Sequence, residues 1–174
     1  MFADLPESVD VWRMVTARRI FEGRVGLEAM PRLVTCLADA EGTCTFRIDF
    51  DRNEQGQALL DLTAETRLPL VCQRTLERFE LPVVIHQQLG LIRAEHEEAA
   101  LPPDVEPLLV PATGAMRLLD VIEDELILAV PVVPMSETGL LAETRAWSAA
   151  GASADEVVEP VNPFSVLASL RDKN

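Results

Sequence analysis

The chain has 174 residues, of which 48% are hydrophobic, and its formal net charge is −14 at pH 7. This length suits one domain with a tail, and this hydrophobic content is enough to fill a sizeable core. The charge argues against broad, non-specific binding of nucleic acid, because an acidic surface repels phosphate; a small basic patch remains compatible with it.

The charge is unevenly distributed along the chain. Residues 1–35 hold five arginines and five acidic residues, whereas residues 95–125 hold nine acidic residues and one arginine. Any surface that contacts nucleic acid is therefore expected in the N-terminal segment. The candidate contacts are Arg13, Arg18, Arg19, Arg24 and Arg32. The alternative is a solvated face on which these arginines form salt bridges.

The cysteines and the N-terminus indicate the compartment. Cys36, Cys44 and Cys72 show no spacing typical of a disulfide framework, which favours a reducing environment. The first residues are acidic and lack a basic segment followed by an apolar core, so no signal peptide is predicted. No uncharged apolar run reaches the roughly 18 residues of a membrane span. We expect a cytoplasmic protein with no membrane partner.

The N-terminal third predicts two helices around a strand. Ser8 is a candidate N-cap for a helix through about Arg19, with its apolar residues at helical spacing. A short strand is expected around 20–25, bounded by Gly23 and Gly26. A second helix is expected at 28–40, where apolar residues recur at i, i+3, i+4 and i+7.

The middle of the chain predicts β structure. Apolar and polar residues alternate at 44–50, 60–68 and 79–85, which is typical of strands with one dry and one wet face. The connections are short, so an antiparallel meander is expected. Pro69 cannot donate to a strand ladder and marks a sheet edge or a strand end.

The C-terminal half predicts an exposed acidic loop at 94–107, a short strand at 108–110 and a closing helix near 117–129. The fold class is α+β, with an antiparallel meander sheet, N-terminal helices and this closing helix in a single domain at 1–134. Residues 135–161 are interpreted as a flexible acidic linker. Residues 162–174 are interpreted as a short helical motif capped by Asn162 and Pro163. Trp147 is either exposed in the linker or a docking anchor.

The acidic cluster Glu123, Asp124 and Glu125 is a candidate for chemistry or for contact with a partner. Consecutive helical residues point about 100° apart, so the three carboxylates cannot converge on one ion. We expect Glu125 to pair with an arginine, and the other two to face water or a partner. Neither a nucleotide-binding motif nor a nucleophile placed beside a base is found. No catalytic residue, metal, cofactor or small-molecule substrate is predicted.

Two stretches carry a family resemblance. One contains Glu123-Asp124-Glu125 and ends in Pro131-Val132-Val133-Pro134; the other is Asn162-Pro163-Phe164 followed by Leu167-Ala168-Ser169-Leu170. Together they resemble the YceD family, the bacterial large ribosomal RNA subunit accumulation proteins. The resemblance is weaker but collinear over 42–90 and includes the corner Cys72-Gln73-Arg74-Thr75.

The resemblance implies a non-catalytic ribosome-biogenesis factor that supports synthesis, processing or stability of 23S rRNA. Its partner would be a large-subunit assembly protein or the precursor RNA. Many members of the family carry a second cysteine where Thr75 stands here, and some look as if they bind zinc. Four soft ligands close a structural zinc site, so we expect none in this chain.

The candidate protein-binding surface consists of the acidic loop at 95–106, the acidic cluster and the tail. Its named residues are Glu123, Asp124, Glu125, Asn162, Pro163, Phe164, Leu167 and Leu170. The tail either docks on its own domain or serves another protein as a helix-in-groove ligand. The sequence is also compatible with two other functions, namely an acidic adaptor unrelated to RNA and, with less support, a hydrolase that uses a carboxylate pair.

Overall fold

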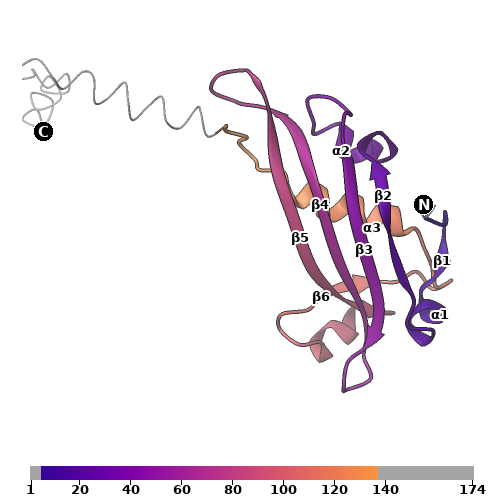
Figure 1. Ribbon diagram of the computed structural model, residues 1–174. Helices are drawn as coiled ribbons and strands as arrows, with labels where there is room; N and C mark the ends of the chain where they lie inside the picture. The colour runs from indigo at the N-terminus through magenta and orange to yellow at the C-terminus, as the bar shows by residue number, and fades with distance from the viewer. Residues whose placement is uncertain (1–4, 137–174) are drawn as a thin grey trace, which may run out of the picture. The chain divides into compact units, whose positions relative to one another are not determined.

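The computed structural model describes residues 5–136, and their centre is a five-stranded sheet (Figure 1). Its strands are β2 (Ile20–Gly26), β3 (Thr43–Arg52), β4 (Ala58–Val71), β5 (Arg78–Ile92) and β6 (Glu106–Leu109). The order is β2-β3-β4-β5-β6, and the first four strands are antiparallel neighbours in chain order. The predicted meander and the α+β class are confirmed. The parallel pairing of β6 with β5 was not predicted.

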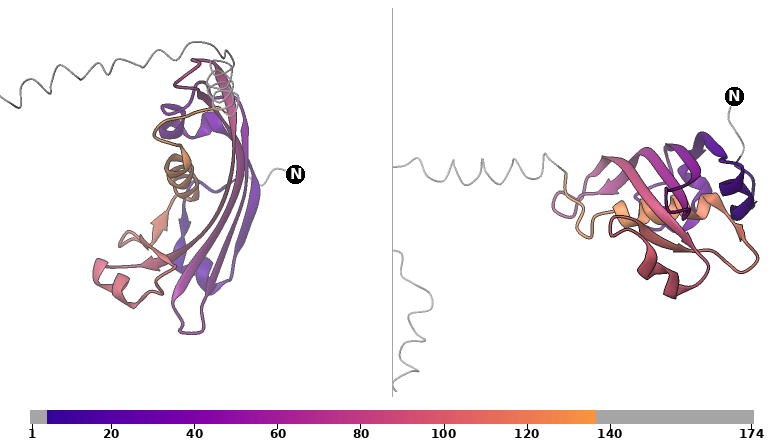
Figure 2. Two further views of the ribbon diagram at one scale, coloured as in Figure 1. Left: turned by 90° about the vertical axis from the view of Figure 1, so that its left-hand side faces the viewer. Right: turned by 90° about the horizontal axis from the view of Figure 1, so that it is seen from below.

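Within residues 5–136, three short α-helices and two 3₁₀ turns accompany the sheet. They are α1 (Val11–Thr16), η1 (Leu27–Ala29), α2 (Pro31–Val34), η2 (Glu95–Ala100) and α3 (Leu118–Ala129). A second, two-stranded sheet joins β1 (Val9–Asp10) to β7 (Ala115–Met116). Figure 2 shows α2 and α3 on the concave side of the large sheet, so no helix of residues 5–136 covers the other face, which we call the open face.

The closing helix is confirmed as α3. Its apolar side has Leu118, Ile122 and Leu126 fully buried against the sheet. Burying side chains of this size stabilises a fold by about 1.5–3 kcal/mol each. The helix stops before Pro131, whose ring restricts the preceding residue to extended backbone.

The alternation seen in the sequence decides which face of the sheet is dry. In β3, Phe46, Ile48 and Phe50 point into the core, whereas Thr45 and Arg47 lie on the open face. Pro69 lies within β4, but the pairing of β4 with β3 ends at Glu65. Beyond that point β4 is a local edge, where the carbonyl of Pro69 accepts from Ala38 N–H at 2.8 Å. The edge interpretation of Pro69 is confirmed.

The helix expected at 28–40 is wrong in extent. Only η1 and the four residues of α2 are helical there, because Pro31 cannot occupy a helix interior and instead begins α2 at its first position. The first helix is also shorter than expected. Asp10, not Ser8, is its N-cap: the Asp10 carboxylate accepts from Arg13 N–H at 3.1 Å, while the preceding residues pair with β7.

No helix among the described residues has the length and apolar character needed to cross a lipid bilayer. The domain boundary at 134 stays a prediction, and the last two described residues, Met135 and Ser136, follow it directly. Nearly all of the predicted linker and all of the C-terminal motif, including Trp147, lie outside the described residues.

Candidate functional site

The acidic cluster on α3 is built around Glu123, whose side chain is 3% exposed. Its carboxylate accepts hydrogen bonds from the backbone N–H of Arg32 at 2.6 Å and of Leu33 at 3.1 Å. These two N–H groups belong to the first turn of α2, whose own N-cap residue, Met30, makes no side-chain capping bond. Glu123 therefore caps α2 from a distant helix, and the partial positive charge of that helix end favours the carboxylate.

Arg32 completes the contact with its guanidinium group. Its Nε donates to Glu123 at 2.9 Å, and its Nη1 contacts the Asp124 carboxylate at 2.6 Å. The hydrogen bonds that Arg32 donates to Glu123 and then to Asp124 raise the pKa of Arg32. Burial alone would raise the pKa of Glu123, but the Leu33 N–H and the Arg32 donors outweigh it and lower that pKa. These contacts form a charged clamp, made by Arg32, Glu123 and Asp124, that holds α2 on α3.

The clamp corrects two expectations for the acidic cluster: that Glu125 pairs with an arginine, and that Glu123 and Asp124 face water or a partner. Glu123 and Asp124 pair with an arginine, whereas Glu125 makes no ion pair with any residue in 5–136. Burial, followed by repulsion from Glu106 and Asp124, raises the pKa of Glu125. Because Glu123 is buried and bonded, it is not available to a partner, which leaves Asp124 and Glu125 as the accessible acids of the cluster. Arg32 is equally committed, since it holds the α3 carboxylates.

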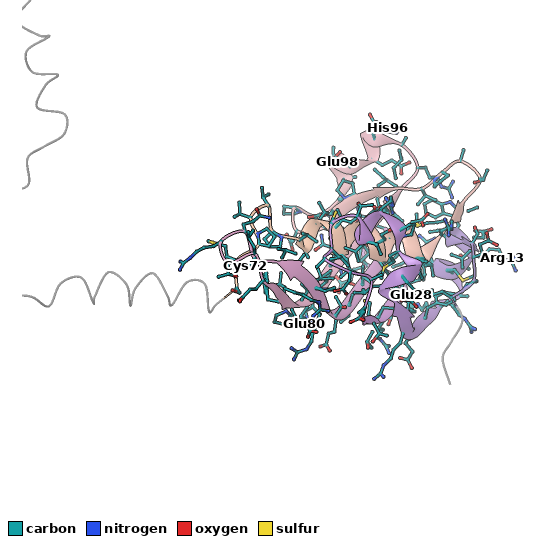
Figure 3. All side chains as sticks on the ribbon, turned by 90° about the horizontal axis from the view of Figure 1, so that it is seen from above. Arg13, Glu28, Cys72, Glu80, His96 and Glu98 are labelled. Atoms are coloured by element: carbon teal, nitrogen blue, oxygen red, sulfur yellow. The ribbon has the colours of Figure 1, made fainter. Side chains whose placement is uncertain are left out.

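The other candidate arginines, Arg13, Arg18, Arg19 and Arg24, are exposed and lie on α1, on β2 or in the turn between them. Arg18 pairs with Asp51 at 3.0 Å. Arg24 lies on β2 at the open face of the sheet, opposite Thr45 of β3. Arg13 projects from α1 at one side of the domain, on the side away from Cys72 (Figure 3). The expected role of these arginines in contacting RNA stays a prediction.

The acidic loop contains η2 and presents most of its carboxylates to solvent. Glu98 and His96 project together on one side of the domain (Figure 3). Glu97 differs, because it accepts from Arg93 N–H at 2.9 Å and so fastens the start of the loop to the end of β5. The tail residues of the proposed protein-binding surface, Asn162 to Leu170, lie outside the described residues.

Comparison with known proteins assigns the family. The family model described as "Large ribosomal RNA subunit accumulation protein YceD" matches residues 60–171, which is more than half of the chain. The chain belongs to this family. A Haemophilus influenzae protein named Large ribosomal RNA subunit accumulation protein YceD is 28% identical over 173 residues, covering 97% of each chain. No solved structure matches.

Within the part that matches the YceD model, Cys72 occupies the turn between β4 and β5. Its sulfur is inaccessible to solvent and accepts from Ser136 N–H at 3.5 Å. The Thr75 hydroxyl, the Ser136 N–H and the N–H groups of Thr75 and Arg74 together lower the pKa of Cys72 to about 6. The sulfur is thus surrounded by donors that favour a thiolate.

This corner does not fit a zinc site. Within residues 5–136 no three side chains of the metal-ligating types gather, and the Thr75 hydroxyl donates to the sulfur where a second thiolate would stand. A closed zinc site needs four ligands, and Cys72 is a single one. That the whole chain binds no zinc stays a prediction.

Sequence reasoning missed a contact between α1 and the end of β5. Trp12 is half-buried, and the Arg93 guanidinium lies 4.4 Å from the centre of its ring. The two residues are far apart in sequence and neither lies in a motif. The sequence offers one signal for this contact: Trp12 is an aromatic residue next to Arg13, in the N-terminal segment that is expected to contact nucleic acid. Both residues precede the two strongest stretches of the family resemblance.

Proposed function

We propose that this protein supports the synthesis, processing or stability of 23S rRNA without catalysis, by binding a large-subunit assembly protein or the precursor RNA. One observation carries the proposal: the chain is collinear, over 97% of both lengths, with a protein named for large ribosomal RNA subunit accumulation. Similarity that extends over nearly the full length of both chains favours a shared role.

The geometry of the acidic cluster supports a binding role over a catalytic one. General acid–base work by carboxylates needs two groups that meet at one substrate with pKa values pushed apart. Glu123 and Asp124 instead meet at the guanidinium of Arg32, and their bonds hold two helices together. The cluster is therefore better suited to fixing a surface than to transferring protons.

Two kinds of partner fit the proposal. A basic large-subunit protein would be attracted to the exposed carboxylates of η2 and to Asp124 and Glu125, and an acidic factor could shield it from non-specific RNA contacts. RNA would instead be attracted to the exposed arginines of the N-terminal segment. Charge reversal of Arg18 and Arg19 separates the two, because it weakens RNA binding and leaves protein binding nearly intact.

The experiment is recovery of the tagged protein from a lysate with and without RNase, combined with deletion of its gene. Deletion is expected to lower the amount of 23S rRNA relative to 16S rRNA. Large-subunit proteins retained after RNase identify a protein partner, whereas 23S precursors recovered only without RNase identify RNA. Unchanged 23S rRNA after deletion, with neither partner recovered, contradicts the proposed function.

A further inference from the structure

The contact between Trp12 and Arg93 divides a surface depression into two parts. The larger part, of about 720 Å³, lies between α1 and the loop that leads into β7, and Arg13 and Gly114 line it. The smaller part, of about 400 Å³, lies beside the β3–β4 connection and includes Arg52. Trp12 and Arg93 line both parts, so the stacked pair is the wall that they share. We call this feature the Trp12 groove.

Among the residues that the structure describes, no ion pair neutralises the cations of the Trp12 groove. Arg13, Arg52 and Arg93 form no salt bridge with any residue in 5–136; Arg52 donates to the Gly56 carbonyl at 2.7 Å. The groove also contains two carboxylates, Asp10 and Glu97. Both accept a backbone N–H, which partly satisfies their charge: Asp10 caps α1, and Glu97 binds the Arg93 N–H. The guanidinium groups therefore outnumber the acids in a chain whose overall charge is −14.

A guanidinium group over an indole ring is suited to a particular ligand. Arginine binds phosphate oxygens with a planar fork of donors, and its free face, like the face of tryptophan, stacks on nucleobases. A base-paired duplex does not expose the planes of its bases. Its long line of phosphates would also be repelled by the acidic surface around the groove. An unpaired nucleotide presents one base plane and few phosphates, which matches a groove of this size.

We propose that the Trp12 groove binds one or two unpaired nucleotides of single-stranded RNA through Trp12, Arg93 and Arg13. This inference rests on the proposed function and names the RNA alternative as the partner at this site. Arg93 and Trp12 provide the stacking surface, and Arg13 and Arg52 contact the flanking phosphates. An acidic peptide is the competing occupant, because it would meet the same cations without using the aromatic ring.

The binding test uses the full chain with Trp147→Phe, which leaves Trp12 as its single tryptophan, and short oligouridylate as the probe. Binding is expected to quench Trp12 fluorescence, to saturate, and to weaken as salt rises. Arg93→Ala is expected to lower the affinity about tenfold, and Arg93→Lys to recover it only in part because an ammonium group does not stack. Arg13→Ala is expected to reduce the salt dependence by about one phosphate contact.

Arg67→Ala is the matched control, since Arg67 is an exposed arginine on the open face of the sheet, away from the groove. It is expected to leave the affinity unchanged. Each protein is first checked for an unchanged melting temperature, and the exposed Arg93 and Arg13 are chosen so that the fold survives. Equal losses in Arg67→Ala and Arg93→Ala, or binding without quenching of Trp12, would overturn the inference. Arg93-dependent binding of polyglutamate with equal or greater affinity would overturn it in favour of an acidic peptide.

Complementation separates this inference from the proposed function. If deletion lowers 23S rRNA and the Arg93→Ala gene fails to restore it, both the proposed function and the groove inference are supported. If deletion lowers 23S rRNA but Arg93→Ala restores it fully and oligouridylate does not bind, the groove inference is wrong and the proposed function survives. If deletion leaves 23S rRNA unchanged while the wild-type groove binds oligouridylate, the proposed function fails and the RNA site stands by itself.

Discussion

Two buried thiols of this protein show how the local surroundings of a residue decide its chemistry. Burial in the core raises the pKa of Cys44 to about 11. Cys72 is equally inaccessible, but donors from Thr75, Ser136 and Arg74 lower its pKa to about 6. The sign of the shift follows from the number of donors aimed at the sulfur and not from burial alone.

Replacing Thr75 by Val is predicted to raise the pKa of Cys72, because the largest contribution to its low value comes from the Thr75 hydroxyl. Thiolate absorbance measured against pH in the Cys36→Ser background, which lacks the exposed thiol, gives the value directly. The wild-type sulfur is expected to ionise near pH 6. A wild-type protein in which no thiol ionises until well above neutral pH contradicts the assignment.

The same shift predicts a pH dependence of stability. An unfolded thiol keeps an ordinary pKa of 9.0, and the folded value is lower. The stabilisation is therefore complete above pH 9.0 and is lost as the pH falls through about 6. Denaturant unfolding of the wild type and of Cys72→Ser measures it. The difference between the two free energies of unfolding is expected to widen as the pH rises, and a constant difference would count against the thiolate.

Glu123 is the residue whose loss should cost the most stability among the charged groups of the clamp. Glu123→Ala leaves two N–H groups of α2 without their acceptor and removes one of the two carboxylates that the Arg32 guanidinium contacts, and we expect a loss of about 2–4 kcal/mol. Asp124→Ala is the control: Asp124 contacts the same arginine but is 57% exposed. It is expected to cost less than about 1 kcal/mol. Urea denaturation measures both, and equal losses would mean that the clamp does not cap α2.

At the scale of elements, the structure depends on short connections held by particular backbone geometries. Gly114 has φ of +72° in the turn before β7, and its carbonyl accepts from Val11 N–H at 2.9 Å, which joins the turn to the start of α1. A Cβ at Gly114 would lie 3.0 Å from Cδ1 of Trp12. The turn, α1 and Trp12 are therefore positioned together.

Gly114→Ala is predicted to destabilise the protein by about 1–2 kcal/mol through backbone strain, with a further loss from the contact with Trp12. Gly56→Ala is a matched control, because Gly56 also has positive φ, at +81°, but has open space around its Cβ position. Thermal unfolding compares the two variants. The additional loss of stability in Gly114→Ala should be accompanied by a change in Trp12 fluorescence, measured in the Trp147→Phe background. An unchanged Trp12 fluorescence would mean that the turn does not position Trp12.

The element-scale errors of the sequence analysis have local causes. Periodicity extended the helix expected at 28–40 across Pro31, although the proline ring and its missing N–H place it at the start of a helix. The strands were predicted well because alternation persists wherever one face of a sheet is buried. The end of β5 was missed because both faces of the strand are buried there. Leu89 to Ile92 are all buried, so apolar and polar residues do not alternate.

At the scale of the whole molecule, the predicted division into a domain at 1–134, a linker at 135–161 and a motif at 162–174 has a direct test. Limited proteolysis is expected to cut first within the linker and to spare the domain, because a segment without a packed core exposes its backbone to proteases. Mass spectrometry of the early fragments locates the cuts. A linker that resists cleavage as long as the domain does would contradict the division.

The sequence by itself determined the class of fold, the meander of β2 to β5 and the closing helix α3. These follow from local alternation, helical periodicity and the proline after α3, each of which acts over a few neighbouring residues. It also indicated the family through two short motifs. Local patterns of this kind can be recognised in the sequence because burial of one face imposes them on every strand and helix.

Only the tertiary structure decided which charges meet. The clamp joins residues of α2 and α3 that lie about ninety positions apart, and the Trp12 groove joins α1 to the end of β5. The parallel pairing of β6 is of the same kind. Such contacts depend on the register of the sheet and on the placement of α3 across it, which no local pattern encodes. The same acidic cluster that looked like a partner surface thus includes a buried helix cap at Glu123, because an arginine and two free N–H groups lie opposite it.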